Sequence, residues 1–429
     1  MTEEFLHYIW QYRLYTPELM LQSGEVVEVI HPGLHNTDSG PDFFNAKIRI
    51  GDTTWAGNIE IHILSSDWKR HNHQLDQSYD NVILHVVWRD DAPVFNKKGL
   101  SIPTLELDGK YNDNAWRNYL RFMASRQWIP CGSMVSIVEP FIRNAWLDRL
   151  LVERLERKSI EVETILSFSN NDWAQTFYRL LARNMGFKLN NQAFEMLARS
   201  LPYQFLARHA DNLFQVEAMV FGQAGLLGDD FSDDYPQKLK KEYEFLKLKF
   251  NLSPVDAHLW RFMRLHPGNF PTLRLAQFAS IIHHSGSIIS KLFDSNEIST
   301  YRKLFTAEAS EYWRTHYVFD KPSAPRMKTL GHSSADLLII NLVAPVLLAY
   351  GRRRSDAEIT SRPVDLLTQL KGEDNSIISK WARLGMDVSN AASTQSLIEL
   401  KTQYCDNKKC LTCTLGNTLL KLPFPKSNL

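Results

Sequence analysis

The sequence has almost no net charge, few cysteines and no long uninterrupted hydrophobic run. Its 49 Lys and Arg residues nearly balance 48 Asp and Glu residues, which leaves a formal net charge of +1. No global field therefore favours nucleic acid or a cationic partner, so any site for a polyanion has to be local. Four cysteines in 429 residues exclude a disulfide scaffold, and a hydrophobic content of 44% excludes a disordered chain.

Targeting and membrane signals are also scarce. Acidic Glu3 and Glu4 stand where a secretory signal peptide would carry basic residues. The longest apolar stretch, residues 337–350, is interrupted by Asn341 and a proline and predicts a buried helix instead of a membrane span. We therefore expect a cytoplasmic protein without a membrane partner, in which cysteines are more often metal ligands or core residues than disulfides.

The apolar pattern changes along the chain. β-branched and aromatic runs predict a helix near residues 3–14 followed by strands at 25–30, 43–50, 55–63 and 82–88. Gly51-Asp52 predicts a hairpin turn between the second and third of these strands. The pattern indicates an α/β or α+β domain over residues 1–112.

From residue 113 to 429 the apolar residues recur at helical spacing, which predicts a large all-α region. The expected helices cover residues 112–125, 141–167, 172–185, 191–201, 204–222, 237–250, 273–283, 334–350 and 394–405. Several of them are long enough to form a bundle packed beside the sheet.

One strand carries ionisable side chains in an alternating pattern. Residues 58–63 place Asn58, Glu60 and His62 on one face and three isoleucines on the core face. The polar loop at residues 35–42 delivers Asp42 to the start of the neighbouring strand, so the hairpin brings Asp42 and Glu60 to the same end of the sheet. Such an oxygen-rich site suits Mg²⁺ or Mn²⁺, which can polarise a phosphodiester and activate a water.

Pro41-Asp42, a gap of 17 residues and Glu60-x-His62 resemble the signature of the PD-(D/E)XK nucleases, over about residues 20–90. In that superfamily the acids bind the metal, and a lysine is thought to position or activate the attacking water. The resemblance implies that Asp42 and Glu60 are metal ligands and catalytic residues. His62 replaces the lysine and is expected to act as a base or as a third ligand.

Further polar residues surround this segment. Six of the 14 histidines fall within 55 residues: His31, His35, His62, His71, His73 and His85. The tract at residues 68–76 is expected either to cover a phosphate or add ligands, or to be a polar loop with solvated histidines. His85 lies in an apolar strand, where a hydrogen-bonded core histidine is the alternative. Glu28 and Asp38 are additional acids for this site.

Several strings carry a broader resemblance: residues 35–43, 57–62, 66–68, 79–87, 269–277 and the terminal cysteine cluster. Through them the whole chain resembles an uncharacterised family of Bacteroidetes proteins, a domain of unknown function. That resemblance implies kinship and no particular activity.

The cysteines form their own pattern, Cys405-x4-Cys410-x2-Cys413, with Cys131 as the fourth. Four thiolates are a complete ligand set for iron or zinc. The x4, x2 spacing is similar to that of plant-type ferredoxins. One remote and three late cysteines also resemble the iron-sulfur staple of RecB-like nucleases, although the lone cysteine precedes the nuclease core there and follows it here. We expect an iron-sulfur cluster ahead of zinc, and reduced cysteines without metal are the alternative.

Two groups of cations are candidates for phosphate contacts: Arg352 to Arg354, and Arg261, Arg264, His266 and Arg274. Helix C-terminal charges and ordinary surface arginines explain the triplet equally well.

These patterns predict a metal-dependent nuclease that hydrolyses DNA or RNA. The first alternative is a catalytically inactive, nuclease-like protein that binds nucleic acid or assembles with other molecules and has a structural cysteine site. The second alternative is a redox or iron-sulfur sensor without nucleic acid.

Overall fold

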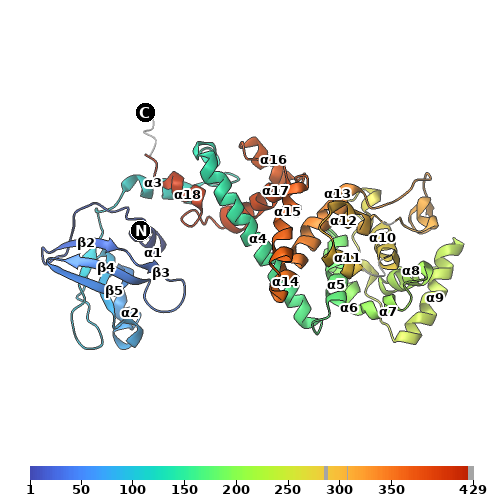
Figure 1. The fold of residues 1–429 in the computed structure, drawn as a ribbon, viewed down its shortest axis with the longest axis horizontal. Helices are drawn as coiled ribbons and strands as arrows, with labels where there is room; N and C mark the ends of the chain where they lie inside the picture. The colour runs from blue at the N-terminus through green and yellow to red at the C-terminus, as the bar shows by residue number, and fades with distance from the viewer. Residues whose placement is uncertain (285–287, 307, 424–429) are drawn as a thin grey trace. The chain divides into compact units, whose positions relative to one another are not determined.

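The computed structural model describes residues 1–284, 288–306 and 308–423, and the chain divides into two compact units (Figure 1). The sheet unit comprises Met1–Trp146 together with the chain from Lys401 onward, and the helical unit comprises Leu147–Leu400. The α+β class is confirmed. The boundaries differ from the expected 1–112 and 113–429, because the segment that carries three of the cysteines returns to the sheet unit.

The sheet unit contains one mixed sheet of seven strands: β1 (Leu19–Met20), β2 (Val26–His31), β3 (Leu34–His35), β4 (Phe43–Ile50), β5 (Thr53–Leu64), β6 (Val82–Arg89) and β7 (Thr104–Glu106). The strand order is β1-β2-β4-β5-β6-β7, and β3 pairs with β4. The pairs from β1 to β5 are antiparallel, whereas β5, β6 and β7 run parallel.

The expected strands are all present, because their sequence signals are local. The β4–β5 hairpin turns at Gly51-Asp52, where Gly51 adopts a left-handed φ of 55° that glycine tolerates. Ile59 and Ile61 of β5 are fully buried. Strand β6, between β5 and β7, is buried along most of its length, as its apolar run predicts.

Four helices accompany the sheet: α1 (Glu3–Gln11), the short α2 (Asp67–Arg70), α3 (Asp113–Ala124) and α18 (Thr414–Leu420). α1 packs on β5 through its apolar face. α3 and α18 lie side by side although about 300 residues separate them in sequence (Figure 1). Asn118 of α3 joins them, since its side-chain amide donates to the carbonyl oxygens of Leu420 and Leu422 at 3.2 and 2.9 Å.

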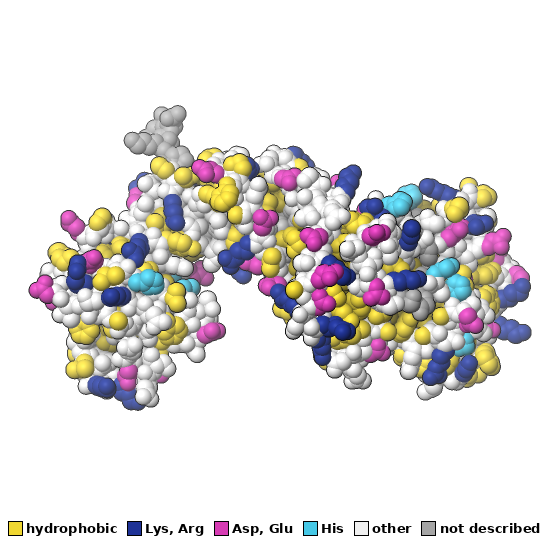
Figure 2. Space-filling view, in the orientation of Figure 1, with side chains coloured by type: hydrophobic (Ala, Val, Ile, Leu, Met, Phe, Trp, Pro, Cys, Tyr) yellow, Lys and Arg dark blue, Asp and Glu magenta, His cyan; other side chains and the backbone are white. Residues whose placement is uncertain are grey.

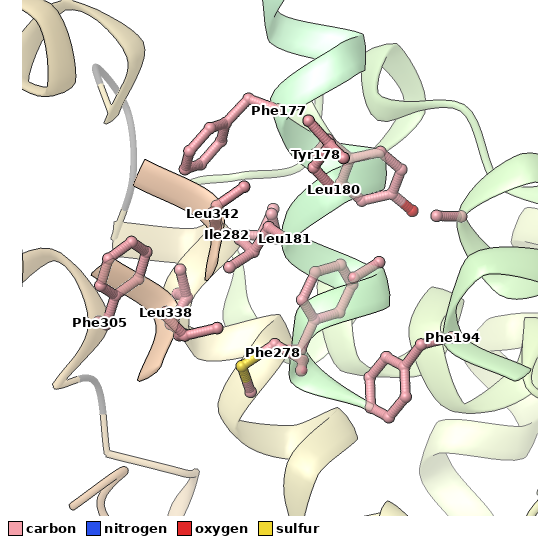
Figure 3. Packing of buried hydrophobic residues seen from close by; sticks show 14 of the residues in the cluster. Phe177, Tyr178, Leu180, Leu181, Phe194, Phe278, Ile282, Phe305, Leu338 and Leu342 are labelled. Carbon is pink, nitrogen blue, oxygen red and sulfur yellow. The ribbon is translucent and has the colours of Figure 1, made fainter. Parts of the chain in front are cut away.

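The helical unit is built around one large hydrophobic core (Figure 3). Phe177 and Tyr178 of α5 (Trp173–Met185), Phe194 of α6 (Asn191–Ser200) and Phe278 of α10 (Pro271–His284) are among its buried aromatic residues. Its other main helices are α4 (Pro140–Phe168), which begins in the sheet unit, α8 (Leu213–Gln223), α9 (Asp234–Phe250), α11 (Ile288–Asp294), α12 (Ile298–Phe305), α14 (Ala344–Arg354), α15 (Ala357–Gln369), α16 (Ser376–Arg383) and α17 (Ala391–Glu399).

The helix expected at 204–222 is interrupted. It consists of α7 (Tyr203–Ala207) and α8, and the side chain of Asn212 accepts from the amide of Gln215 at the start of α8. Asparagine caps a helix more readily than it continues one, and the helical apolar spacing does not reveal this competition.

The apolar stretch at 337–350 is a buried helix, as expected. Among the described residues, His332–Arg354 is long and apolar enough to cross a membrane by length and composition, yet 72% of its apolar window is buried inside the protein. The helix widens into a π-helical turn at Ile339–Val343, just before Pro345, whose missing N–H interrupts the regular α-helical ladder.

Candidate metal centre

Secondary structure brings acids and histidines from four segments to one place in the sheet unit. Asp42 lies directly before β4, and Glu60 and His62 lie on β5. The parallel register pairs Glu60 with His85 of β6. The connection between β5 and β6 contains α2 and the histidines that follow this helix. The connection therefore brings these histidines to the same end of the sheet.

Glu60 is the centre of this group. It is only 4% exposed, and its Oε2 accepts from the backbone amide of Asp42 at 3.1 Å. Its Oε1 lies 3.5 Å from Nε2 of His62 and 3.3 Å from Nε2 of His73. One carboxylate oxygen therefore fixes the side chain, while the other faces two imidazole nitrogens.

Three histidines converge beside that oxygen. One ligand atom from each of His62, His71 and His73 lies within 4.8 Å of the others. Nε2 of His62 is 3.1 Å from Nδ1 of His71. Nε2 of His73 is buried and has no hydrogen-bond partner among the described residues. The site thus contains an unsatisfied nitrogen, whose desolvation is unfavourable unless a proton donor or a metal ion meets it.

The separations match those around a metal ion. Zinc–nitrogen and zinc–oxygen bonds of about 2.0–2.1 Å place the ligand atoms of a tetrahedral site about 3.3 Å apart. His62 and His71 are 3.1 Å apart, and Oε1 of Glu60 lies 3.3 Å from His73 and 3.5 Å from His62. The three histidines form the compact group, and Glu60 stands beside two of its members. The donor set and its spacing therefore fit a divalent transition-metal ion.

His85 lies behind His62, where it can determine the tautomer. Nε2 of His85 is 2.8 Å from Nδ1 of His62, and His85 is fully buried. If His62 donates its Nδ1 proton to His85, the Nε2 of His62 keeps a free lone pair toward His71 and Glu60. Proteins usually orient a metal-binding imidazole by a hydrogen bond from its other nitrogen to a carboxylate, a carbonyl or a water, and here His85 takes that place.

Asp42 is adjacent to the group, but its contacts differ from those of Glu60. Its Oδ2 accepts from the amide of Ile61 at 2.8 Å and lies 3.3 Å from Nε2 of His7. Asp42 and Glu60 are therefore tied together through the backbone of β5 and the start of β4. Asp42 contributes negative charge and alignment, whereas Glu60 presents an oxygen to the histidines.

Burial determines the protonation of these residues. Desolvation lowers the pKa of His62 to about 2 and that of His85 to about 3, and it also lowers the pKa of His73. The neighbouring histidines lower the pKa of His62 further. Burial and the nearby Asp42 raise the pKa of Glu60 well above its ordinary value. Burial thus favours the neutral imidazole in His62, His73 and His85, and the neutral form is the one that binds metals.

A comparison with protein families identifies the kinship of the chain. The family described as Protein of unknown function (DUF2851) matches residues 3–376. The chain belongs to the DUF2851 family. The matched range includes every residue of the histidine group in this DUF2851 protein. No curated protein and no solved structure shows significant similarity to the chain.

The sequence indicated part of this site. Asp42, Glu60 and His62 come together as the hairpin predicted, although Glu60 and His62 are buried. The sequence left open whether His71 and His73, in the connection between β5 and β6, are ligands or solvated loop residues. The clustering of histidines in the sequence was the signal that they belong to the site. His7 of α1 was missed, since only tertiary packing brings α1 to Asp42.

Other expected acids lie elsewhere. Glu28 is exposed on β2 and pairs with Arg49. Asp38 is exposed in the loop before β4, where its backbone amide donates to the side chain of Asn36. Neither belongs to the group of His62, His71 and His73 that could hold a metal ion.

The four cysteines all lie in the sheet unit. Each is a free thiol, with Cys131, Cys410 and Cys413 buried and Cys405 half-buried. Cys131 follows α3, whereas the other three precede or begin α18. The fold therefore gathers cysteines that the sequence separates by more than 270 residues.

Three of the candidate phosphate-binding cations are engaged with the protein itself, whereas Arg261 and Arg264 are exposed. Arg274 is buried, donates to Gln277 at 3.0 Å and stacks over the ring of Phe187. Arg352 pairs with Glu156, and Arg353 donates to the side chain of Asn171 at 2.8 Å. Cations and acids are interspersed over the face of the protein that Figure 2 shows.

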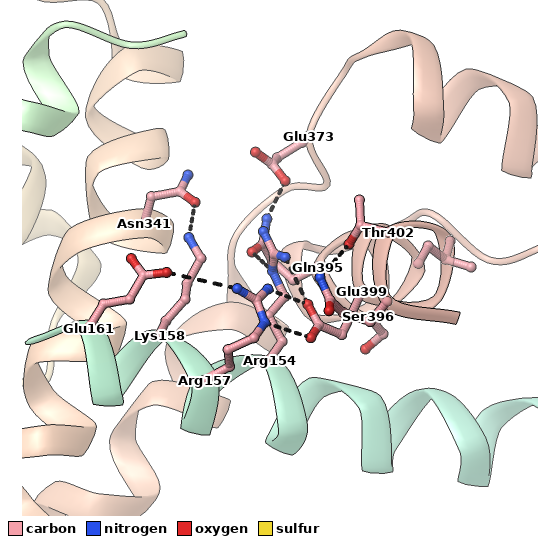
Figure 4. A network of polar contacts seen from close by, with 12 residues as sticks. Arg154, Arg157, Lys158, Glu161, Asn341, Glu373, Gln395, Ser396, Glu399 and Thr402 are labelled. Atoms are coloured by element: carbon pink, nitrogen blue, oxygen red, sulfur yellow. Dashed lines mark hydrogen bonds and ion pairs between the residues drawn. The ribbon is translucent and has the colours of Figure 1, made fainter. Parts of the chain in front are cut away.

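The helical unit of the DUF2851 protein has a cavity of about 550 Å³ that contains none of the predicted site residues. Lys158 projects into it and donates to the side chain of Asn341 at 2.6 Å (Figure 4). Burial, with a smaller contribution from Arg154, lowers the pKa of Lys158 to about 7. Asn341 lies on the π-helical turn, so the irregular turn positions a cavity-lining side chain.

Proposed function

We propose that the sheet unit of this DUF2851 protein holds a divalent metal ion and hydrolyses phosphodiester bonds in DNA or RNA. The observation that carries the proposal is the carboxylate oxygen of Glu60 facing Nε2 of His62 and of His73 at 3.5 and 3.3 Å. His71 completes the group. The bound metal would polarise the phosphodiester and lower the pKa of a water.

The ligand set favours Mn²⁺ or Zn²⁺. Mg²⁺ prefers oxygen ligands and keeps several waters, whereas imidazole nitrogen suits zinc and other transition metals. With Oδ2 of Asp42 already bonded to the amide of Ile61, the direct ligands in this proposal are the grouped His62, His71 and His73. Oε1 of Glu60, next to His62 and His73, is the fourth proposed ligand. Asp42 supports Glu60 and balances the charge of the metal ion.

His62 takes a different role from the lysine of the PD-(D/E)XK signature. That lysine is a cation, whereas buried His62 has a pKa lowered to about 2 and is neutral. It therefore supplies a lone pair in place of a charge. The positive charge that stabilises the reacting phosphate comes from the metal ion and from cations at the entrance.

The entrance lies on the side of the crossover between β5 and β6. His71 is exposed and His73 is half-buried, so the group opens to solvent at these residues. Lys69 and Arg70 directly precede His71 and are exposed. Arg70 pairs with Asp67 at 2.8 Å, so Lys69 is the cation that supplies local positive charge for a phosphate backbone in a protein whose overall charge is nearly zero.

The second candidate is a nuclease-like protein without catalysis. The observation in its favour is the nearly complete burial of Glu60 and His62, at 4% and 1% exposed, which also suits a structural metal. In this case the metal would hold the crossover on the sheet, and nucleic acid would bind without being cut.

The test combines metal content with cleavage. The full chain would be purified anaerobically, its metals quantified, and single- and double-stranded DNA and RNA offered with Mn²⁺, Zn²⁺ or Mg²⁺. Glu60→Gln and His73→Ala are the site variants. Glu28→Gln is the matched control, because it neutralises a carboxylate outside the group, on β2, which β4 separates from β5.

We expect cleavage that falls by roughly 100-fold or more in both site variants, with metal affinity reduced by at least ten-fold, and no change in the control. Wild-type protein that binds metal and nucleic acid but cuts no substrate would favour the non-catalytic candidate. Absence of metal binding in wild-type protein would contradict both candidates.

A further inference from the structure

A second donor cluster lies in the sheet unit, outside the histidine group. Cys405 ends a π-helical segment (Leu400–Cys405), Cys410 lies in the following turn, and Cys413 is the N-cap of α18. Cys131 joins them from the loop after α3. π-helical turns are rare and occur frequently at functional sites, so the segment that leads to Cys405 is an independent indication of a site.

The cysteine segment is held in place by contacts that do not involve sulfur. Asn118 donates to the carbonyl groups of Leu420 and Leu422, and the hydroxyl of Tyr8 donates to the carbonyl of Asn417 at 3.4 Å. A Cβ atom on Gly416 would stand 2.2 Å from the carbonyl oxygen of Cys410, so only glycine fits there. The sulfurs are therefore positioned by the fold.

The four thiols affect one another's pKa values. Burial raises the pKa of Cys131 and of Cys410 to about 12, and repulsion from Cys413 raises both further. The other three thiols likewise raise the pKa of Cys405. Geometry brings the same two segments together, since Nζ of Lys401, four residues before Cys405, lies 5.3 Å from the centre of the Trp128 ring, three residues before Cys131.

Hydrogen-bond donors surround one of the sulfurs. The backbone amides of Leu415 and Gly416 and the side chain of Trp146 donate to Cys413 and lower its pKa, against the larger raising effect of burial. Donors of this kind stabilise thiolate ligands and adjust the potential of metal clusters.

The spacing distinguishes the kind of centre. Four thiolates on one zinc ion, at about 2.3 Å from it, would lie about 3.8 Å from one another. Among the described residues, the only group of three or more ligand atoms within 4.8 Å is the histidine group. No three of the cysteine sulfurs therefore form a group as compact as a single zinc ion requires, whereas the wider thiolate spacing around a cluster of several atoms is compatible with this arrangement.

We propose that Cys131, Cys405, Cys410 and Cys413 ligate an iron-sulfur cluster that fastens the C-terminal segment to the loop after α3. Four cysteines leave no open coordination position, so the cluster is a structural element independent of the phosphodiesterase chemistry. It closes a loop of more than 270 residues, across which the whole helical unit is inserted.

The experiment measures iron, acid-labile sulfide and zinc in the full chain purified anaerobically, together with its visible absorption and electron paramagnetic resonance after reduction. Cys131→Ser and Cys410→Ser are the ligand variants. Thr412→Ser is the matched control, because it changes a residue between two proposed ligands without removing sulfur. Circular dichroism and limited proteolysis report folding.

The expected result is stoichiometric iron and sulfide in the wild type and in Thr412→Ser, with at least a ten-fold loss in both cysteine variants. Stoichiometric zinc without iron would overturn the proposal, as would metal-free wild-type protein with four titratable thiols. The wild-type measurement decides this even if the cysteine variants fail to fold.

Discussion

At the scale of single residues, the candidate metal centre depends on which atom each side chain presents. Glu60 uses one oxygen to hold the start of β4 and turns the other to the histidines. His85 contacts His62 on the side away from the group. A metal site therefore depends on residues that never touch the metal, and these can be changed without removing a ligand.

His85→Phe should weaken metal binding while leaving all four proposed ligands present. Loss of the partner behind His62 releases its ring and tautomer, so we expect affinity to fall by roughly 10- to 100-fold. Competition with a chelator of known affinity measures this effect. His31→Phe, on exposed β2, is the control, and equal affinity in both variants would contradict the assigned role of His85.

Glu217 of the helical unit gives a pH-dependent prediction. It is fully buried and accepts from Ser310 at 3.0 Å and from Tyr235. Burial raises its pKa from the ordinary 4.5 to about 7. The folded state therefore holds this proton more tightly than the unfolded state does.

The stabilisation from protonated Glu217 is complete below about pH 4.5 and is lost as the pH rises to about 7. The loss is at most about 3 kcal/mol. Glu217→Gln should remove this decline and make the helical unit more stable than the wild type above pH 7. Denaturant unfolding at pH 5 and pH 8 measures it, and identical pH slopes in the two proteins would contradict the prediction.

At the scale of elements, buried ion pairs join α4 to α17 inside the helical unit (Figure 4). Glu399 is 2% exposed and accepts from Arg154 at 3.1 Å and from Arg157 at 2.6 Å. Gln395, one turn earlier on α17, bonds both Arg154 and Glu373. A charged network at a helix contact specifies which faces meet, whereas apolar packing alone tolerates rotation.

Glu399→Gln should destabilise the helical unit by about 3 kcal/mol, because it leaves two guanidinium groups without their shared carboxylate. Glu161→Gln is the control: Glu161 is half exposed and lies 3.9 Å from Arg157, so we expect a loss below about 1 kcal/mol. Urea unfolding of both variants measures the difference. Similar losses in the two variants would show that burial does not strengthen this network.

At the scale of the whole molecule, the chain leaves the sheet unit, forms the helical unit and returns. The returning segment completes the first unit, since Leu415, Leu419 and Leu420 of α18 are at most 1% exposed. Each fully buried leucine contributes roughly 1.5–3 kcal/mol. Their sum is comparable to the total stability of a typical domain, about 5–15 kcal/mol.

Deletion of residues 401–429 should therefore unfold the sheet unit or lower its melting temperature strongly, while the helical unit keeps its transition. Differential scanning calorimetry would resolve the two transitions, with the helical one as the internal reference. Unchanged melting of the sheet unit would contradict the assignment of this segment to it.

Local signals in the sequence determined much of this protein. Alternation predicted β4 and β5, Gly51-Asp52 predicted their turn, and these brought Asp42 to Glu60. Helical periodicity predicted the helical region and most of its long helices, but it did not predict α11, α12, α15 and α16 or the break at Asn212. Membership of a family of unknown function was also readable from sequence strings.

Only the tertiary structure decided the rest, because it depends on residues that are distant along the chain. The register of parallel β5 and β6 placed His85 behind His62, and the crossover turned His71 and His73 toward Glu60. The return of the chain placed three cysteines in the same unit as Cys131. Sequence periodicity reports the environment of a residue within its own element, whereas a binding site is defined by atoms from several elements.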